Sequence, residues 1–253
     1  MNIGGYRATG VLGKGGSATV YRATDGSAEV AIKVLDAPNP RFAREARLAR
    51  RITSRHVVPV LAAGPDYLVM PLYERTLAQD IPLSLPETIR IGAQVARGLD
   101  ALHDAWILHR DVKPSNVLLD ERRDAALADF GLARGDDSTQ LTGDGQLMGT
   151  PHYLAPELIE GRPASPASDI YALGCVLYEC VTGAPPFAGL HDAEIGYAHL
   201  VEPPPDPRTR NPALPADSAV ALLTALAKEP SARPTTATAL ARMLHLAGTP
   251  APA

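Results

Sequence analysis

The densest group of reactive side chains lies between His109 and Asn116, in the run His-Arg-Asp-Val-Lys-Pro-Ser-Asn. Asp111 could accept or orient the proton of a hydroxyl group, and Lys113 could neutralise a phosphoryl group during its transfer. Asn116 and, thirteen residues later, Asp129 offer the hard oxygen ligands that Mg²⁺ prefers. These residue types predict phosphoryl transfer with a divalent cation, whereas His109, which has apolar neighbours, is better explained as a packing residue.

A further cation, Lys33, lies inside the strand-like run Val30–Leu35. Strand alternation places Lys33 on the same face as Ala31, and a buried charge there needs a partner, which Glu45 on the following helical segment can supply. The chain has only four lysines among 24 basic residues, so a retained lysine favours a role that the planar fork of arginine does not fill, such as contact with two phosphate oxygens. The alternative is a solvent-exposed lysine on an edge strand.

Glycines 13, 15 and 16 form a turn between two strand-like segments, Val11–Leu12 and Thr19–Arg22. A dinucleotide-binding fold would place such glycines between a strand and a helix, so the pattern instead favours a flap whose backbone N–H groups lie over phosphates. An ordinary hairpin loop explains these glycines equally well.

These groups need a scaffold, and the periodicity of apolar residues predicts a small β-rich part followed by a mostly helical part. Ser168–Val181 is apolar nearly all round, which indicates a buried central helix. The expected elements are strands within residues 6–35, a helix over Pro40–Ile52, short strands over Val57–Leu61 and Tyr67–Leu72, further helices over Pro86–His103, Ser168–Val181, Ala216–Ala227 and Thr235–Leu246, and a proline-rich surface loop over Glu202–Pro215.

Composition excludes several other classes of protein. The 253 residues carry a net charge of -4, which gives no reason to expect binding to nucleic acid or to an anionic membrane. No run of about 18 apolar residues is present, so we expect no membrane-spanning segment. Cys175 and Cys180 lie five residues apart in one predicted helix, so we expect free structural thiols in a reducing compartment.

In combination these residues resemble the eukaryotic-like (Hanks-type) serine/threonine protein kinases of bacteria, and the resemblance extends from Tyr6 to Leu246. The motifs occur in the order of that family: the glycine turn, Val-Ala-Ile-Lys33, Glu45, His109-Arg110-Asp111, Asn116, Asp129-Phe130-Gly131 and Ala155-Pro156-Glu157. By the same resemblance, Asp169 is the buried aspartate that braces the catalytic loop, and Arg233 is the ion-pair partner of Glu157.

The resemblance implies an α+β, bilobal protein kinase fold. The kinase domain would occupy residues 1–247, with an N-lobe at about 1–72 and a C-lobe at about 73–247, followed by a flexible tail at 248–253. The implied activity is ATP-dependent phosphorylation of serine and threonine hydroxyls in proteins, with Mg²⁺ as cofactor and Mn²⁺ as a substitute. Two alternatives share the fold: a pseudokinase scaffold, which usually lacks one of the catalytic groups present here, and a kinase of small molecules, which would lack Ala155-Pro156-Glu157 and the Asp169 brace.

The resemblance also implies a role for each site residue. Asp111 is the catalytic base, Lys113 contacts the γ-phosphate, Asn116 and Asp129 hold Mg²⁺, and Lys33, fixed by Glu45, positions the α- and β-phosphates. The remaining implied nucleotide contacts are the glycine-turn residues Gly13, Lys14, Gly15 and Gly16, the adenine-enclosing residues Leu12, Val20, Ala31 and Leu118, the gatekeeper Met70, and Leu72 and Tyr73 of the hinge.

The polar segment Leu132–Met148 has the composition of a mobile activation loop. A phosphate on Ser138, Thr139 or Thr142 could pair with Arg110 and order this loop, so we hypothesise autophosphorylation there. By resemblance, Thr150 helps to set the acceptor site beside Asp111.

The expected partners are protein substrates with serine or threonine acceptors, and the resemblance is compatible with a homodimer that phosphorylates itself in trans. The chain is expected to be cytoplasmic, or to be the cytoplasmic part of a longer membrane-anchored protein.

Overall fold

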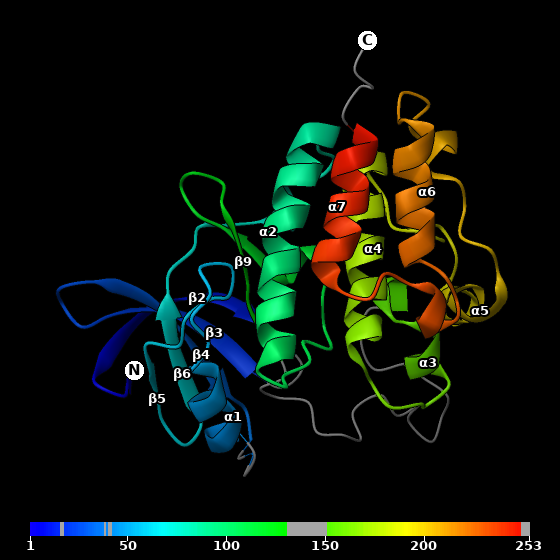
Figure 1. Ribbon diagram of the computed structural model, residues 1–253. Coiled ribbons are helices and arrows are strands. Elements are labelled where there is room, and N and C mark those ends of the chain that lie inside the picture. Colours follow the sequence, from blue (N-terminus) through cyan, green and yellow to red (C-terminus); the bar gives the residue numbers. More distant parts are fainter. Residues whose placement is uncertain (16–17, 38, 40–41, 131–150, 249–253) are drawn as a thin grey trace.

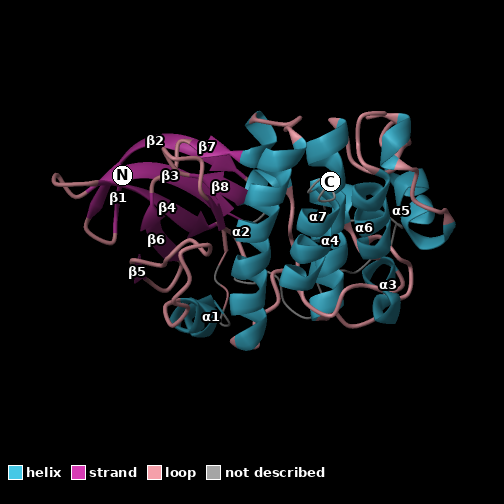
Figure 2. Ribbon diagram, turned by 45° about the horizontal axis from the view of Figure 1, so that its top comes forward, coloured by secondary structure: helices cyan, strands magenta, loops and turns pink. Residues whose placement is uncertain are grey.

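The computed structural model describes residues 1–15, 18–37, 39, 42–130 and 151–248, and it separates the strands from most of the helices (Figure 1). Strands gather at one end of the molecule and helices at the other, as the colouring by secondary structure shows (Figure 2). One large apolar cluster joins the two ends, because it includes Phe42 and Leu68 from the first part and Leu99 and Leu173 from the second. The expected α+β architecture is therefore confirmed.

Six strands form one antiparallel sheet in the order β1-β2-β3-β4-β6-β5. Strand β4 lies inside this sheet between β3 and β6, so the alternative of an edge-strand Lys33 is wrong. Helix α1 (Phe42–Ala49) packs beside the sheet and ends three residues before the predicted Ile52. The strands are β1 (Asn2–Ile3), β2 (Tyr6–Lys14), β3 (Ala18–Thr24), β4 (Glu29–Leu35), β5 (Ala62–Ala63) and β6 (Tyr67–Pro71).

The strand expected over Val57–Leu61 is wrong. Val57 forms only an isolated bridge to Leu127, and the paired strand β5 begins at Ala62. Pro59 interrupts the run and has no N–H to donate, while the Val58 N–H donates to Leu127 at 2.8 Å, away from the larger sheet. The valines Val57, Val58 and Val60 are buried, whereas Pro59 and Leu61 are exposed. Periodicity cannot distinguish such a short, partly buried run from a strand.

A second, three-stranded sheet has the order β7-β8-β9 and was not predicted. Its strands are only two or three residues long, too short for a periodic pattern: β7 (Arg75–Thr76), β8 (Val117–Leu119) and β9 (Ala125–Leu127). The antiparallel register pairs Val117 with Leu127, so the start of β8 lies beside the end of β9.

Four helices of the second part match the predicted ones to within two residues at each end, and three of them, α2, α4 and α7, lie side by side (Figure 1). Their bounds are α2 (Leu85–Asp104), α4 (Pro166–Thr182), α6 (Ala216–Ala225) and α7 (Ala237–Gly248). Helix α2 begins where the Ser84 hydroxyl accepts from the Glu87 N–H, with Pro86 in its first turn. Helix α4 is buried around most of its circumference, and it ends at Gly183, whose φ of +81° suits glycine.

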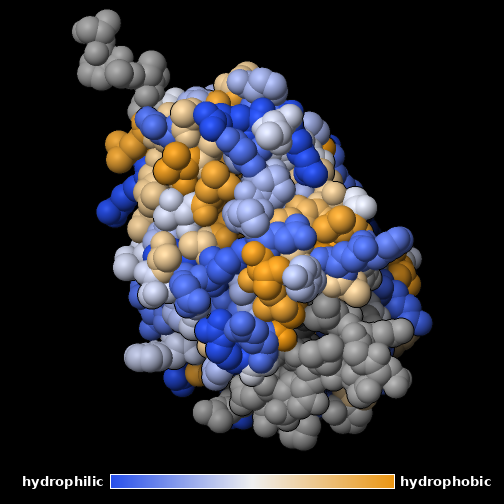
Figure 3. All heavy atoms as spheres, turned by 90° about the vertical axis from the view of Figure 1, so that its right-hand side faces the viewer, coloured by the Kyte–Doolittle hydropathy of each residue, from blue (hydrophilic) through white to orange (hydrophobic). Residues whose placement is uncertain are grey.

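Helices α3 (Pro156–Ile159) and α5 (Asp192–Val201) complete the helical part, and neither was predicted. The predicted loop over Glu202–Pro215 is present but contains one short 3₁₀ turn, Pro207–Thr209. On the side of the molecule toward α5 and α6, hydrophobic residues form several separate groups among hydrophilic ones (Figure 3). Among the described residues, no helix combines the length and the apolar character that crossing a bilayer requires.

Candidate active site

The second sheet brings Asn116 and Asp129 to the same edge. Asn116 immediately precedes β8, and Asp129 follows β9 by two residues. Because the two strands are antiparallel, their adjacent ends carry these two side chains, and the Ala128 N–H donates to the Asn116 carbonyl at 2.9 Å. Residues that lie thirteen positions apart in the chain thus become neighbours through one hairpin.

Asp111, Lys113 and Asn116 form a hydrogen-bonded group. Lys113 Nζ lies 2.9 Å from Asp111 Oδ2. Asn116 Nδ2 donates to the same Oδ2 at 3.0 Å and to the Asp111 carbonyl at 2.8 Å. An ammonium and an amide therefore fix the orientation of the Asp111 carboxylate, which is the geometry that a hydroxyl-orienting base requires.

Lys33 crosses from the larger sheet to the second sheet. Its Nζ donates to Asp129 Oδ1 at 2.8 Å, and the Lys33 side chain is only 12% exposed. This ion pair therefore joins a cation on β4 to a carboxylate just after β9, although the two residues lie 96 positions apart in the chain. The contact was not predicted, because Lys33 was assigned to Glu45, whose side chain lies outside the described residues.

Asp169 of α4 fixes the segment that carries Asp111. Its Oδ2 accepts from the His109 N–H at 2.9 Å, and its Oδ1 accepts from the Arg110 N–H at 2.8 Å. His103 Nε2 also lies 2.8 Å from Oδ2, so the carboxylate has three partners. Arg110 has a φ of +65°, an unfavourable conformation for a residue with a Cβ, and the hydrogen bonds to Asp169 stabilise it.

The His109 side chain is a packing residue, as predicted. It is fully buried, and its ring meets the ring of Phe130 edge to face at a centroid distance of 6.4 Å. Burial lowers the pKa of His109 below its usual value, because a charged imidazole is poorly solvated there. The Asp111 N–H donates to His109 Nδ1 at 3.3 Å, so this ring supports the backbone of the site without entering its chemistry.

Several of the predicted adenine contacts share one apolar cluster. Met70, Tyr73 and Leu118 pack with Val58, Ala126 and Ala128. Ala31 is the register partner of Met70 across β4 and β6. Leu12 is 45% exposed on β2, and no contact places Leu72, Val20 or Leu12 in this cluster.

Only part of the glycine turn is described. Gly13 and Lys14 end β2, and the Gly15 N–H donates to the Ala18 carbonyl at 2.9 Å. A Cβ built on Gly13 would meet no described protein atom within 4 Å, so protein packing does not require glycine at that position. The remaining predicted positions that lie outside the described residues are Gly16, Ser138, Thr139, Thr142 and Thr150.

The predicted ion pair between Glu157 and Arg233 is present. Arg233 Nη1 and Nη2 each lie 2.7 Å from one oxygen of the Glu157 carboxylate, in a bidentate pair that is almost fully buried. Ser168 also donates to Glu157 at 2.7 Å. Burial raises the pKa of Glu157, but the hydrogen bonds from Arg233 and Ser168 outweigh it and hold the pKa below its usual value.

Comparison with known proteins decides the family. A model of the family described as "Protein kinase domain" matches residues 6–244 of the chain. The chain belongs to the protein kinase family. The DNA damage-responsive serine/threonine-protein kinase RqkA of Deinococcus radiodurans is 41% identical over an alignment covering 96% of this chain and 40% of that protein. For the serine/threonine-protein kinases PknH and PknE of Mycobacterium tuberculosis, the identities are 36% and 37%.

This kinase domain corresponds to only part of each of these proteins. It spans 42% of the length of PknH and 46% of the length of PknE, whereas 96% and 97% of the present chain are covered. The resemblance to bacterial Hanks-type kinases is therefore confirmed for the domain itself.

Proteins of this family use ATP and a divalent cation, and the residues of the site fit both. Asn116 Nδ2 is bound to Asp111, so the oxygen end of that amide is the one suited to a cation. Asp129 Oδ1 is paired with Lys33, and within the described part of the chain Oδ2 has no hydrogen-bond partner. One amide oxygen and one carboxylate oxygen fit Mg²⁺, which usually completes its shell with water and substrate phosphates.

Sequence reasoning missed one supporting residue of the site, His103 near the end of α2. Only its position in the last turn of a predicted helix distinguished it, and many surface histidines occupy such positions. Arg22 of β3 was also missed, although its Nη2 donates to both carboxylate oxygens of Glu74, just after the hinge, at 2.8 and 2.9 Å. Both contacts join segments far apart in the chain, so no local pattern could indicate them.

Proposed function

We propose that this domain transfers the γ-phosphoryl group of ATP to serine and threonine hydroxyls of proteins. One observation carries the proposal: Lys33 contacts Asp129, Lys113 and Asn116 contact Asp111, and the Ala128 N–H, next to Asp129, donates to the Asn116 carbonyl and joins the two groups. Phosphoryl transfer needs positioning and charge neutralisation more than covalent help, and this set supplies both.

The site residues divide the tasks of the proposed reaction among them, and Asn116 has two. Asp111 accepts or orients the hydroxyl proton of the acceptor, and Lys113 and Asn116 keep its carboxylate in place. Lys33 binds phosphate oxygens of ATP, while Asn116 and Asp129 would hold Mg²⁺ through their free oxygens. The cation, when bound, neutralises charge that develops on the phosphate oxygens.

The test removes the ability of Asp111 to accept a proton. Asp111→Asn should lower phosphate transfer from labelled ATP to a generic basic protein by about 10² to 10⁴-fold, while nucleotide affinity changes little. Asp104→Asn, at an exposed position at the end of α2, is the matched control and should keep full activity. Equal turnover of Asp111→Asn and the parent would exclude Asp111 as the base.

We further propose that the domain phosphorylates its own segment 132–148, on Thr139, Thr142 or Ser138. The composition of that segment and its place between the Asp129 and Glu157 motifs support this assignment. Mass spectrometry after incubation with ATP and Mg²⁺ should find phosphate there in the parent and none in Asp111→Asn. An active enzyme with an unmodified segment would refute self-phosphorylation but leave the kinase assignment intact.

A further inference from the structure

Arg22 of β3 projects from the same face of the larger sheet as Lys33. In the register of β3 with β4, Val20 lies opposite Lys33. Two residues further along β3, Arg22 lies opposite Ala31. Directly opposed residues of antiparallel strands share a face, as do residues two positions apart on one strand. Because Lys33 reaches Asp129 from this face, Arg22 also faces the three-stranded sheet.

The partner of Arg22 belongs to the other side of the site. Arg22 Nη2 donates to both carboxylate oxygens of Glu74, at 2.8 and 2.9 Å. Glu74 directly precedes β7, in which Thr76 is the register partner of Leu118 on β8. The Arg22–Glu74 pair is therefore a second direct contact between the larger sheet and the segment that enters the three-stranded sheet.

The predicted adenine contacts lie next to this pair. Ala31, which lies opposite Arg22, is also the register partner of Met70. Met70 packs in one apolar cluster with Tyr73, the residue that directly precedes Glu74. The Arg22–Glu74 pair therefore lies beside the predicted adenine pocket, at its hinge end.

A second carboxylate holds the guanidinium of Arg22 in place. Arg22 Nη1 donates to Glu29 of β4 at 3.0 Å. The Arg22 side chain is 30% exposed, and those of Glu29 and Glu74 are 56% and 67% exposed. Ion pairs this exposed change an equilibrium constant by only about two- to fivefold. Such a change is negligible against the stability of a whole domain, yet it is measurable in the affinity for a ligand.

We propose that Arg22 and Glu74 are positioning residues for adenine nucleotides, because their ion pair holds the larger sheet against the hinge segment before a nucleotide binds. A pocket whose walls are already in place binds more tightly, since less order has to be imposed on binding. Within the described residues, neither side chain hydrogen-bonds to the groups proposed to hold phosphate or Mg²⁺. The pair should therefore set nucleotide affinity and leave the rate of transfer unchanged. This inference rests on the nucleotide binding of the proposed function.

Calorimetry with ADP and Mg²⁺ measures the affinity of the parent, Arg22→Gln, Glu74→Gln and the double variant. Each single variant should bind ADP about threefold more weakly, within the range of an exposed ion pair. The double variant should also lose about threefold instead of about ninefold, because both substitutions remove the same contact. In phosphate transfer the KM for ATP should rise by a similar factor, while kcat at saturating ATP stays that of the parent. These differences should shrink at high salt, which screens exposed charges.

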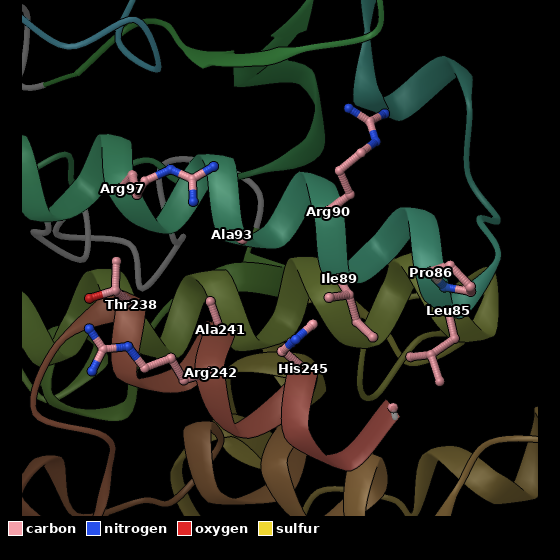
Figure 4. A pocket seen from close by; sticks show the side chains of 11 residues that line it. Leu85, Pro86, Ile89, Arg90, Ala93, Arg97, Thr238, Ala241, Arg242 and His245 are labelled. Atoms are coloured by element: carbon pink, nitrogen blue, oxygen red, sulfur yellow. The ribbon is translucent and has the colours of Figure 1, made fainter. Parts of the chain in front are cut away.

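Two substitutions of the same chemical kind serve as controls. Glu29→Gln removes the other carboxylate from Arg22 but keeps the contact with Glu74, so it should change ADP affinity less than Glu74→Gln does. Arg242→Gln removes a guanidinium from α7, where Arg242 lines a groove of about 670 Å³ between α2 and α7 (Figure 4). None of the residues that line this groove belongs to the candidate active site, so ADP affinity should stay unchanged.

An ADP affinity equal to that of the parent in both Arg22→Gln and Glu74→Gln would overturn the inference and leave the kinase assignment intact. Additive losses in the double variant would also overturn it, because the two residues would then act separately. A lower kcat with an unchanged KM would overturn it by assigning the pair to the transfer step. A parent that bound no ADP would overturn this inference together with the proposed function.

Discussion

Arg233 offers the sharpest test of how the helical part is held together. Its guanidinium donates to both oxygens of Glu157 and to the carbonyls of Ala227, Ala167 and Lys228, at distances of 2.7 to 2.9 Å. Its side chain is fully buried, so water cannot replace these contacts. Arg233→Met keeps much of the volume and apolar surface but removes every donor.

The expected cost follows from what the substitution leaves behind. Breaking a buried ion pair by removing one partner costs about 3 to 5 kcal/mol, because an uncompensated charge stays in the interior. The free energy of unfolding of a whole domain is about 5 to 15 kcal/mol, so this loss is a large share of it. With a urea slope of about 3 kcal/mol per molar, a loss of 4 kcal/mol lowers the unfolding midpoint by about 1.3 M.

Urea denaturation followed by circular dichroism measures this change, and Arg208→Met is the matched control. Arg208 forms an equally close pair with Asp206, but both side chains are partly exposed, at 48% and 34%. That substitution should cost less than about 1 kcal/mol. Glu157→Gln combined with Arg233→Met should cost less than the sum of the single changes, because the pair is coupled. If Arg233→Met and Arg208→Met were equally stable, burial would not be what makes the Glu157–Arg233 pair important.

The same pair makes stability depend on pH. The pKa of Glu157 is lowered in the folded protein, so its contribution is fully present above about pH 4.3, the usual value for an unfolded glutamate. It is lost as the pH falls through the lower folded value. The difference in stability between the parent and Glu157→Gln should therefore shrink in acid, and a difference that grew as the pH fell would contradict this sign.

Three further substitutions test the site and its support. Lys33→Met should reduce nucleotide affinity, measured by calorimetry, and should also reduce phosphate transfer. It should change the urea midpoint little, because the side chain of its partner Asp129 is 33% exposed. Unchanged nucleotide affinity would contradict the assignment of Lys33. Asp169→Asn should lower kcat by about 10- to 100-fold with little effect on nucleotide affinity, because the substitution weakens the hydrogen bonds that hold the segment carrying Asp111. An unchanged kcat would show that these hydrogen bonds are dispensable for catalysis. Gly98→Ala should destabilise by about 1 to 3 kcal/mol in thermal unfolding despite the better helix propensity of alanine, because its methyl would lie 2.4 Å from a backbone carbonyl oxygen. Gly92→Ala in the same helix meets only a movable leucine side chain and should cost less; the reverse order would refute the steric explanation.

The sequence by itself determined the chemistry and the long elements. Asp111, Lys113 and Asn116 lie within six positions of one another, so these three residues stay close together in almost any fold. The helices over 85–104 and 166–182 are long enough for their apolar pattern to specify them, and both were predicted to within two residues. The ion pair of Glu157 with Arg233, 76 positions apart, came only from the family resemblance.

Tertiary structure alone decided which distant groups meet. The contact of Lys33 with Asp129 depends on how the two sheets pack, and the three-stranded sheet that positions Asp129 has strands too short to leave a pattern. Val57 and Val58 pair with Leu127 of the three-stranded sheet, and the first hydrogen bond of this run to the larger sheet comes only from Leu61, a division that depends on how the two sheets pack. Local sequence fixes which side chains are present and how each segment tends to fold, whereas the pairing of remote charges depends on distances that only the assembled chain defines.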